Sequence, residues 1–157
     1  MNESTEYLTQ EKYDEFKSEL DYLKHTKRKE VAEALEYAKS LGDLSENAEY
    51  HEARDNQANV EDRIARLELI LKDASIVSST SKHNTDVVAI GSVVTVQKEG
   101  GKPAIFTIVG SEEADSSLGK ISMKSPIGSA LMGRKKKDSF NVNTPLGVVK
   151  YVVVEIK

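Results

Sequence analysis

Two heptad repeats of similar length, separated by a few residues, constrain this chain more than any other feature. In both repeats, apolar side chains recur at alternating spacings of three and four residues, as in a coiled coil. The second repeat places on this seam Tyr50, Ala53, Gln57, Val60, Ile64, Leu67, Leu71 and Ala74. The first repeat places there Phe16, Leu20, Leu23, Lys27, Val31, Ala34, Ala38 and Leu41. Because only Gly42 to about Ser45 separates the repeats, the two helices are expected to pair as an antiparallel hairpin.

The ends and the interior of these helices also have sequence signals. An extra four-residue step around Lys27 predicts a local stutter in the first helix. Thr9 can cap that helix, and Gly42 can end it in the left-handed conformation. Asp43 and Glu46 have the spacing of a capping box, which predicts Asp43 as the N-cap of the second helix. Each arm then has about 30 residues and a length of about 45 Å.

The turn between the helices, residues 42–55, is strongly acidic. Its carboxylates are Asp43, Glu46, Glu49, Glu52 and Asp55. Capping accounts for the first two alone, although a solvated acidic face is the usual explanation of a charge run. A narrow rod with this much acid at its end can deliver carboxylates, and a metal ion that they hold, into the site of another molecule.

The composition excludes several classes of protein. The 157 residues include no cysteine, which excludes disulfides and thiolate metal sites. The three histidines are too scattered for a zinc motif, and no catalytic triad or nucleophile elbow is present. The polar amino-terminal segment has no signal core, and no stretch reaches the length of a membrane span. We therefore expect a soluble cytoplasmic protein, without membrane contact, that has no self-contained active site.

Charge and composition divide the chain into two parts. Residues 1–75 hold 11 Lys and Arg against 19 Asp and Glu, a net charge of −8. Residues 76–157 hold 11 against 7, a net charge of +4. Between them, a serine-rich stretch loses the heptad and gains loop-forming residues. The sequence predicts a coiled-coil hairpin domain over 1–75, a linker over 76–86 and a second domain over 87–157.

The second domain has the alternating pattern of short strands. Strands are expected at residues 87–90, 93–96, 104–109, 120–123, 139–142 and 148–156, with a hairpin turn at 99–102. One short helix interrupts them, with Ser125 as its N-cap, Pro126 in its first position and Gly133 after its end. The fold class is therefore α+β, with a mostly antiparallel sheet following a long helical hairpin.

Two basic clusters lie outside the acidic turn. The first, midway along the first helix, consists of Lys24, His25, Lys27, Arg28 and Lys29. It is either a solvated face that pairs with nearby glutamates or a surface that contacts RNA or an acidic protein wall, and the sequence does not decide between them. The second cluster, Arg134–Lys137, is expected on an exposed turn, where solubility alone can explain it.

The acidic turn resembles that of a known family. The residues from Gly42 to His51, followed by Ala53 and Arg54, are similar to the hairpin tip of the bacterial Gre transcript-cleavage factors. The other matching segments are Ser125–Gly128, Leu131–Gly133 and Thr144–Gly147. The resemblance implies an FKBP-like carboxy-terminal domain that docks on the rim of the secondary channel of RNA polymerase, while the coiled coil enters that channel. One departure is Lys137, because many relatives have a glycine there.

The resemblance also implies an activity. Factors of this family act on polymerase that has backtracked and extruded the RNA 3′ end into the channel, and they stimulate the polymerase to hydrolyse that RNA. By position, Asp43 and Glu46 would help to hold a second, weakly bound Mg²⁺ within the polymerase complex, and would not bind it stably alone. Contacts to polymerase or to the nascent RNA 3′ end are expected from Tyr50, His51, Arg54, Lys24, Lys27, Arg28, Lys29, Ser125, Pro126, Ile127 and Gly128.

Two other interpretations stay open. A non-catalytic protein could occupy the same channel and inhibit or modulate polymerase, although the presence of both Asp43 and Glu46 argues against it. A helical-hairpin chaperone or adaptor would hold clients with its arms, which requires exposed apolar surface on the rod. The chain is expected to be a monomer.

Overall fold

The computed structural model describes residues 5–77 and 86–157. These residues form two compact units. One is a helical rod, Glu11–Ala74, and the other joins the described residues before Glu11 to those from Ser75 onward. The predicted hairpin domain, 1–75, therefore differs from this division at its amino-terminal end, and most of the predicted linker, 76–86, lies outside the described residues. No helix in the described parts is both long and apolar enough to span a membrane.

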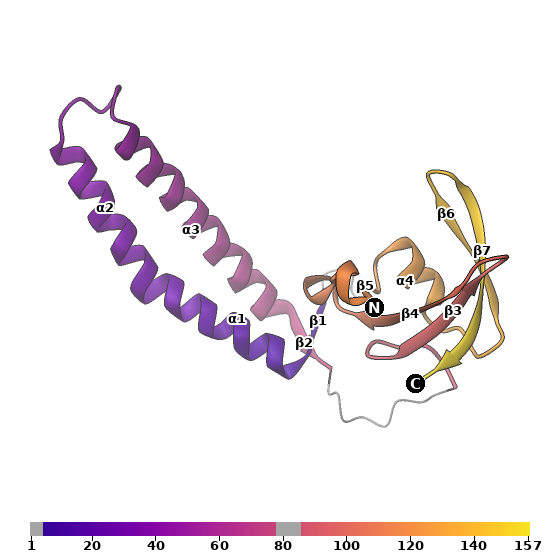
Figure 1. Ribbon diagram of the computed structural model, residues 1–157. Helices are drawn as coiled ribbons and strands as arrows, with labels where there is room; N and C mark the ends of the chain where they lie inside the picture. Colours follow the sequence, from indigo (N-terminus) through magenta and orange to yellow (C-terminus); the bar gives the residue numbers. More distant parts are fainter. Residues whose placement is uncertain (1–4, 78–85) are drawn as a thin grey trace. The chain divides into compact units, whose positions relative to one another are not determined.

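The rod is a hairpin of two long helical arms (Figure 1). The first arm consists of α1 (Gln10–Tyr22), a π-helical turn η1 (Leu23–Lys27) and α2 (Arg28–Ser40), and the second arm is α3 (Ala48–Asp73). The predicted seam residues that are buried are Phe16, Val31, Ala38, Ala53, Val60, Ile64 and Leu67. The predicted helical hairpin is confirmed, because these side chains come from both arms.

The seam differs from the prediction near its ends. Ile70 is buried where Leu71 was expected, and Leu71 is half-buried. In the first arm, Ala34 is exposed while the next residue, Leu35, is half-buried. Leu41 is 52% exposed because it follows the last helical residue of α2. A strict heptad drifts against a straight helix of 3.6 residues per turn, so shifts of one residue are expected along an arm of this length.

The stutter predicted around Lys27 has the form of a π-helical turn. The backbone N–H of Arg28 donates to the carbonyl of Leu23, five residues earlier. A π turn takes in one residue more than an α turn, so it absorbs the extra residue of the repeat. Phe16 before this turn lies under Arg63 of α3, and Val31 after it packs against α3 residues Val60 and Ile64. Both halves of the first arm therefore face α3.

Ion pairs also join the two arms. The Arg63 guanidinium donates to both carboxylate oxygens of Glu19, at 2.7 and 2.8 Å. Arg28 binds Glu61 in the same two-pronged way, at 2.7 and 2.6 Å. The hydrogen bonds from Arg63 lower the pKa of Glu19, so this carboxylate stays ionised in the folded rod. These pairs fix the register of the arms along their exposed edges.

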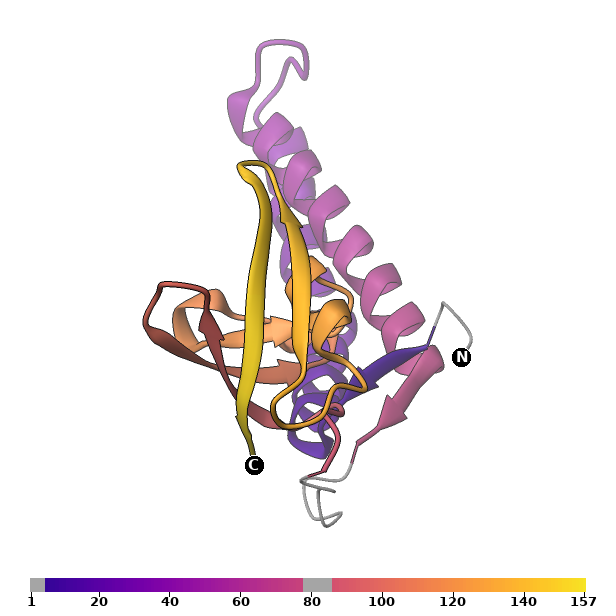
Figure 2. The same cartoon turned by 90° about the vertical axis from the view of Figure 1, so that its right-hand side faces the viewer.

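A five-stranded sheet forms the centre of the other unit. Its strands are β3 (Val93–Lys98), β4 (Pro103–Val109), β5 (Lys120–Ser122), β6 (Ser139–Thr144) and β7 (Gly147–Ile156). Their order is β5-β4-β3-β7-β6, and every neighbouring pair is antiparallel except β4 and β5. Figure 2 shows β6 and β7 as a long hairpin. The mostly antiparallel sheet and five of the six predicted strands are confirmed.

The strand predicted at residues 87–90 is wrong. This segment has no strand hydrogen bonding, although Val88 is buried in the core of the sheet unit. The Val88 N–H donates to the Arg134 carbonyl at 2.8 Å, and the Val88 carbonyl accepts from Gly133 N–H at 2.9 Å. The Val88 backbone groups are therefore satisfied by the connection between the helix α4 (Pro126–Leu131) and β6, so the apolar run contributes to packing without joining the sheet.

The short helix α4 (Pro126–Leu131) follows the prediction closely. The Ser125 hydroxyl accepts a hydrogen bond from Gly128 N–H at 3.1 Å, and Pro126 occupies the first helical position. A Cβ on Gly128 would lie 1.9 Å from the Ser122 carbonyl oxygen, so only glycine fits this approach of helix to strand. Leu131 of α4 is fully buried and packs with β3, β4 and β7 residues in the core.

A small two-stranded ribbon was not predicted. It consists of β1 (Glu6–Leu8) and β2 (Ala74–Ile76), which lie side by side in Figures 1 and 2. Strands of three residues are too short to have a readable period. Two polar contacts attach β1 and its neighbour Thr9 to the sheet unit: Lys124 binds Glu6 at 2.9 Å, and Thr9 N–H donates to Glu113 at 2.6 Å.

Candidate functional site at the hairpin tip

The tip of the rod is a loop between α2 and α3. Helix α2 ends at Ser40, and Gly42 has a φ of +119°, which glycine adopts without the strain that other residues incur. The end predicted for the first helix is therefore correct. Helix α3 begins at Ala48, so the acidic residues Asp43 and Glu46 lie in the loop before it.

Asn47, and not Asp43, caps α3. Its side-chain oxygen accepts from Tyr50 N–H at 3.1 Å, and its side-chain nitrogen donates to the Ala38 carbonyl at 2.6 Å. The predicted capping box of Asp43 and Glu46 is therefore wrong. Asn47 is an equally good N-cap residue and has a donor that Asp43 lacks, so it can satisfy α3 and the end of α2 together. An asparagine directly before the helical run was the sequence signal for this role.

Asp43 has a different local structure. Its Oδ1 accepts hydrogen bonds from the backbone N–H of Ser45 at 3.0 Å and from the Ser45 hydroxyl at 2.9 Å. This Asx-type turn stiffens the loop. The backbone bond and then the hydroxyl bond from Ser45 lower the pKa of Asp43. The side chain is exposed, so an ionised carboxylate is held in one orientation at the surface of the tip.

The remaining tip carboxylates are exposed. They are Glu46, Glu49, Glu52 and Asp55. Within the described residues, neither they nor Asp43 make an ion pair, and no group of three or more acidic or histidine side chains is placed to hold a metal ion. The tip therefore presents separate carboxylates to solvent, which a partner could use together.

The other predicted tip residues lie on the first turns of α3. The Tyr50 ring is half-buried and meets the His51 ring edge-on, with centroids 5.7 Å apart. His51 and Arg54 are exposed, while Ala53 between them is buried in the seam. The structure thus brings Tyr50 and His51 together, and leaves Arg54 available on the outer side of the arm.

The first basic cluster is paired within the rod. Its contacts are Lys24 with Glu68, His25 with Asp21 at 3.0 Å, Lys27 with Glu30 at 3.1 Å, Arg28 with Glu61 at 2.6 Å and Lys29 with Glu33 at 3.9 Å. Each cation has a carboxylate on its own arm or on α3. This pattern favours the interpretation of a solvated face with internal ion pairs, and contact of this cluster with RNA stays a prediction.

The predicted contact residues Ser125–Gly128 belong to the sheet unit. They form the start of α4, where Ser125 and Gly128 have the structural roles of helix cap and close backbone contact. Pro126 is exposed and Ile127 is half-buried against the core. A docking role of this segment stays a prediction.

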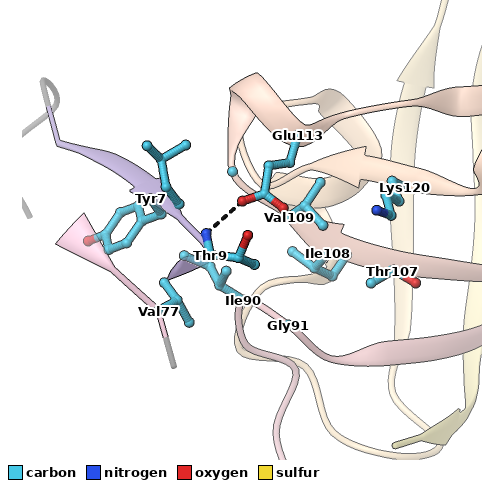
Figure 3. A pocket seen from close by; sticks show the side chains of 12 residues that line it. Tyr7, Thr9, Val77, Ile90, Gly91, Thr107, Ile108, Val109, Glu113 and Lys120 are labelled. Carbon is cyan, nitrogen blue, oxygen red and sulfur yellow. Dashed lines mark hydrogen bonds between the residues drawn. The ribbon is translucent and has the colours of Figure 1, made fainter. Parts of the chain in front are cut away.

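An apolar cavity of about 200 Å³ lies between β1 and the sheet (Figure 3). Tyr7 and Val77 approach it from one side, and Ile90 and Val109 from the other. Its charged lining side chains are Glu113, which accepts the Thr9 N–H, and Lys120. The Glu113 carboxylate thus attaches β1 to the sheet, and the cavity belongs to the packing between them. The tip remains the candidate site.

Comparisons with known proteins agree with this organisation. A family model described as "Transcription elongation factor, N-terminal" matches residues 6–76, and one described as "Transcription elongation factor, GreA/GreB, C-term" matches residues 82–157. Transcription elongation factor GreA of Clostridioides difficile strain 630 is 50% identical over 159 residues, covering 100% of this chain and 99% of the relative. GreA of Clostridium acetobutylicum is 47% identical, with 100% of both chains covered.

A solved structure, that of the GreA factor homolog 1 protein of Thermus thermophilus, is 28% identical and covers 98% of this chain and 99% of its own. Its TM-score of 0.44 is too low to add to the argument. The family models and the full-length relatives suffice, and they confirm the resemblance that the tip residues suggested. With both halves matched and its acidic hairpin tip intact, this chain belongs to the GreA/GreB family of transcription elongation factors.

Proposed function

We propose that this protein inserts its helical hairpin into the secondary channel of RNA polymerase and stimulates the polymerase to cleave the 3′ end of backtracked RNA. Asp43 and Glu46 are the residues that carry the activity, and the sheet unit docks on the polymerase. The observation that carries this proposal is the state of the tip. Its carboxylates are exposed and make no ion pair with any described residue, while carboxylates along the rod such as Glu19 and Glu61 are paired with arginines of the opposite arm.

The tip loop orients one carboxylate before any partner is bound. Ser45 holds Oδ1 of Asp43 with two hydrogen bonds, and no described donor occupies Oδ2. The hydrogen bonds from Ser45 also lower the pKa of Asp43, so the carboxylate is already ionised and releases no proton when a ligand binds. Asn47 fixes the loop to the ends of both arms. An ionised carboxylate that is already oriented loses less conformational entropy on binding than a mobile one.

The donor atoms at the tip fit Mg²⁺, which prefers hard oxygen ligands and often takes only one or two protein carboxylates. Asp43 and Glu46 would hold it jointly with the polymerase, since two carboxylates alone make an incomplete site and no described cluster of three is available. When bound, the ion supplies Lewis-acid activation for phosphodiester hydrolysis. The protein then needs no active site of its own, and Tyr50, His51 and Arg54 lie where they can contact polymerase or RNA beside the two acids.

The experiment uses a stalled, backtracked bacterial RNA polymerase complex with labelled RNA and Mg²⁺. Wild-type protein and the Asp43→Asn, Glu46→Gln double variant are compared at concentrations that saturate binding. Faster cleavage with the wild type and none above background with the variant is the expected result. Full stimulation by the variant would refute the role of the tip.

The same assay separates the rival functions. Slower nucleotide addition without cleavage would identify an inhibitory channel binder. No effect on polymerase, together with suppressed aggregation of an unrelated client, would identify a helical chaperone. All seam side chains except Ala34 and Leu41 are buried or partly buried, which argues against the chaperone because little of the seam is left for a client.

A further inference from the structure

The connection between α4 and β6 contains four consecutive cations, Arg134–Lys137, here called the basic turn. All four residues are exposed. Within the described residues, none of their side chains makes an ion pair, whereas Lys24, Lys27, Arg28 and Lys29 of the rod cluster are all paired. The basic turn therefore presents charge that the fold itself does not use.

The backbone of this turn is well fixed. Asp138 N–H donates to the Lys135 carbonyl at 3.1 Å, and the Asp138 carboxylate accepts from Lys135 N–H at 2.8 Å. Lys137 N–H donates to the Val153 carbonyl of β7 at 2.8 Å. Lys136 and Lys137 are thus the two corner residues of a tight turn anchored to the sheet. Asp138, the nearest acid in sequence, is occupied by the backbone.

Lys137 is held in an unfavourable backbone conformation. Its φ is +75°, and among the described residues it is the one non-glycine residue with a positive φ. This corner of the turn is a position where glycine would be free of strain. The turn would be less strained with glycine at this position, so the turn itself gives no reason for a lysine there.

Two acids lie near the basic turn and reduce its positive electrostatic potential. Asp86 and Glu155 line a shallow hollow together with Lys135 and Lys136. Glu155 also pairs with Lys157 at 3.4 Å. Arg134 and Lys137 do not line this hollow, so the first and the last cation of the run lie outside it.

The basic turn suits a row of phosphates. Arg134 donates its Nε to the Ala130 carbonyl at 3.1 Å, so only part of its guanidinium fork is available to a partner. The other three residues are lysines, which act as mobile point charges and match the closely spaced charges of a nucleic-acid backbone. A partner with one or two isolated carboxylates is less favoured, because it would leave most of the four cations without an anion.

Single-stranded nucleic acid is also less favoured, because it is bound by stacking of bases on aromatic side chains. Phe140 is buried and stacks with Tyr151 at a centroid distance of 5.6 Å, and Phe106 packs against the core. We propose that the basic turn Arg134–Lys137 contacts the phosphate backbone of duplex DNA without reading its sequence. This proposal does not rest on the tip or on RNA cleavage.

The test is a titration of the full-length, ¹⁵N-labelled protein with a short DNA duplex at low salt, with affinity measured in parallel by fluorescence anisotropy. We expect the amide shifts to concentrate at 134–138. The variant Lys135→Gln, Lys136→Gln, Lys137→Gln should lose about ten-fold or more in affinity, and its salt slope should fall by about 2 to 3, because each neutralised phosphate contributes about 0.9.

A matched control removes the same charge elsewhere in the sheet unit. Lys98→Gln, Lys102→Gln, Lys150→Gln also loses three lysines, and should keep most of the affinity. Equal loss in both variants would show a general charge effect and would overturn the proposal, as would unchanged binding by the basic-turn variant.

The strained residue gives a second, independent variant. Lys137→Gly should unfold at a higher temperature, because it relieves the positive φ, and should bind DNA more weakly, because it removes a cation. Unchanged DNA affinity in this more stable variant would contradict a use for the Lys137 side chain. Equal or tighter binding of single-stranded RNA or of polyglutamate would refute duplex DNA as the partner.

Discussion

Charged residues serve different ends along the rod and at its tip. Along the rod, Arg63 with Glu19 and Arg28 with Glu61 join the two arms through paired hydrogen bonds. At the tip, five carboxylates are exposed without an ion pair among the described residues. Like charges that crowd one end of a hairpin repel one another and do not favour folding. Charged side chains of the rod thus stabilise the pairing of its arms, whereas those of the tip are available to a partner.

The backbone of the tip is nevertheless ordered by polar side chains that carry no charge. Ser45 fixes Asp43, and Asn47 fixes the loop to both arms. The tip therefore combines a backbone fixed by hydrogen bonds with carboxylates that make no ion pair among the described residues. Substitutions that affect the packing of the rod, the support of the tip loop or the charge of the rod and tip can test this division.

Leu67→Ala should have the largest effect on stability. Leu67 is fully buried between the arms, so its truncation leaves a cavity and should lower the free energy of unfolding of the rod by about 2 to 5 kcal/mol. Urea unfolding followed by circular dichroism at the helical band measures this. Leu69→Ala, two residues along and 61% exposed, is the control and should change little. Similar losses for both would mean that the seam is not the main packing surface.

Asn47→Ala should have an intermediate effect. It removes the cap of α3 and one of the two donors to the Ala38 carbonyl, the other being Leu41 N–H, which together should cost about 1 to 2 kcal/mol. Asn47→Ser keeps a side-chain oxygen that can cap α3 and loses only the donor to Ala38, so its loss should be smaller. If Asp43→Ala destabilised the rod more than Asn47→Ala did, the assignment of the cap would be wrong.

Glu19→Gln should cost less, and its effect should depend on pH. The pair with Arg63 is partly exposed, so it contributes a few tenths to about 1 kcal/mol at neutral pH. Because the folded pKa of Glu19 is lowered, the unfolded state binds more protons, and this contribution is lost as the pH falls through the folded pKa. Wild type and variant should therefore converge in acid. A difference that persisted there would contradict an ionic origin.

Ser45→Ala should have the smallest effect on stability and a measurable effect at the tip. It removes one of the two hydrogen bonds to Asp43 Oδ1, so the pKa of Asp43 should rise toward its ordinary value. Carboxyl carbon shifts in NMR titrations measure this change. Ser45→Thr retains the hydroxyl and is the control. If the pKa of Asp43 were the same in both variants, the hydroxyl bond would not orient the carboxylate.

Long-range periodicity made the rod predictable, and local competition made the tip harder to predict. The heptads indicated the hairpin and, through one four-residue step, the place of the π-helical turn. The capping-box spacing predicted Asp43 as the cap of α3, but Asn is as good a capping residue as Asp, so this spacing did not exclude Asn47. Asn47 prevails because its amide can also reach Ala38 on the other arm, and the sequence alone does not show that geometry.

The sheet unit gives the same lesson. Alternating strands were predictable, but the apolar segment 87–90 supplies Val88 to the core without joining the sheet, because its backbone pairs with the connection around Gly133. The short ribbon of β1 and β2 had no readable period. For the candidate site, the residue types and their spacing indicated which acids belong to it. The structure was needed to show that these acids are exposed and make no ion pair with a described residue.

The most direct test compares two double variants that each neutralise two carboxylates. Asp43→Asn, Glu46→Gln changes the tip, and Glu19→Gln, Glu61→Gln changes the rod. Unfolding and stimulation of RNA cleavage by backtracked polymerase are measured for both at a temperature where both are folded. The tip variant should keep wild-type stability and lose stimulation, and the rod variant should lose stability and keep stimulation. Stimulation that survives in the tip variant, or is lost equally in the folded rod variant, would contradict the assignment of function to the unpaired acids of the tip.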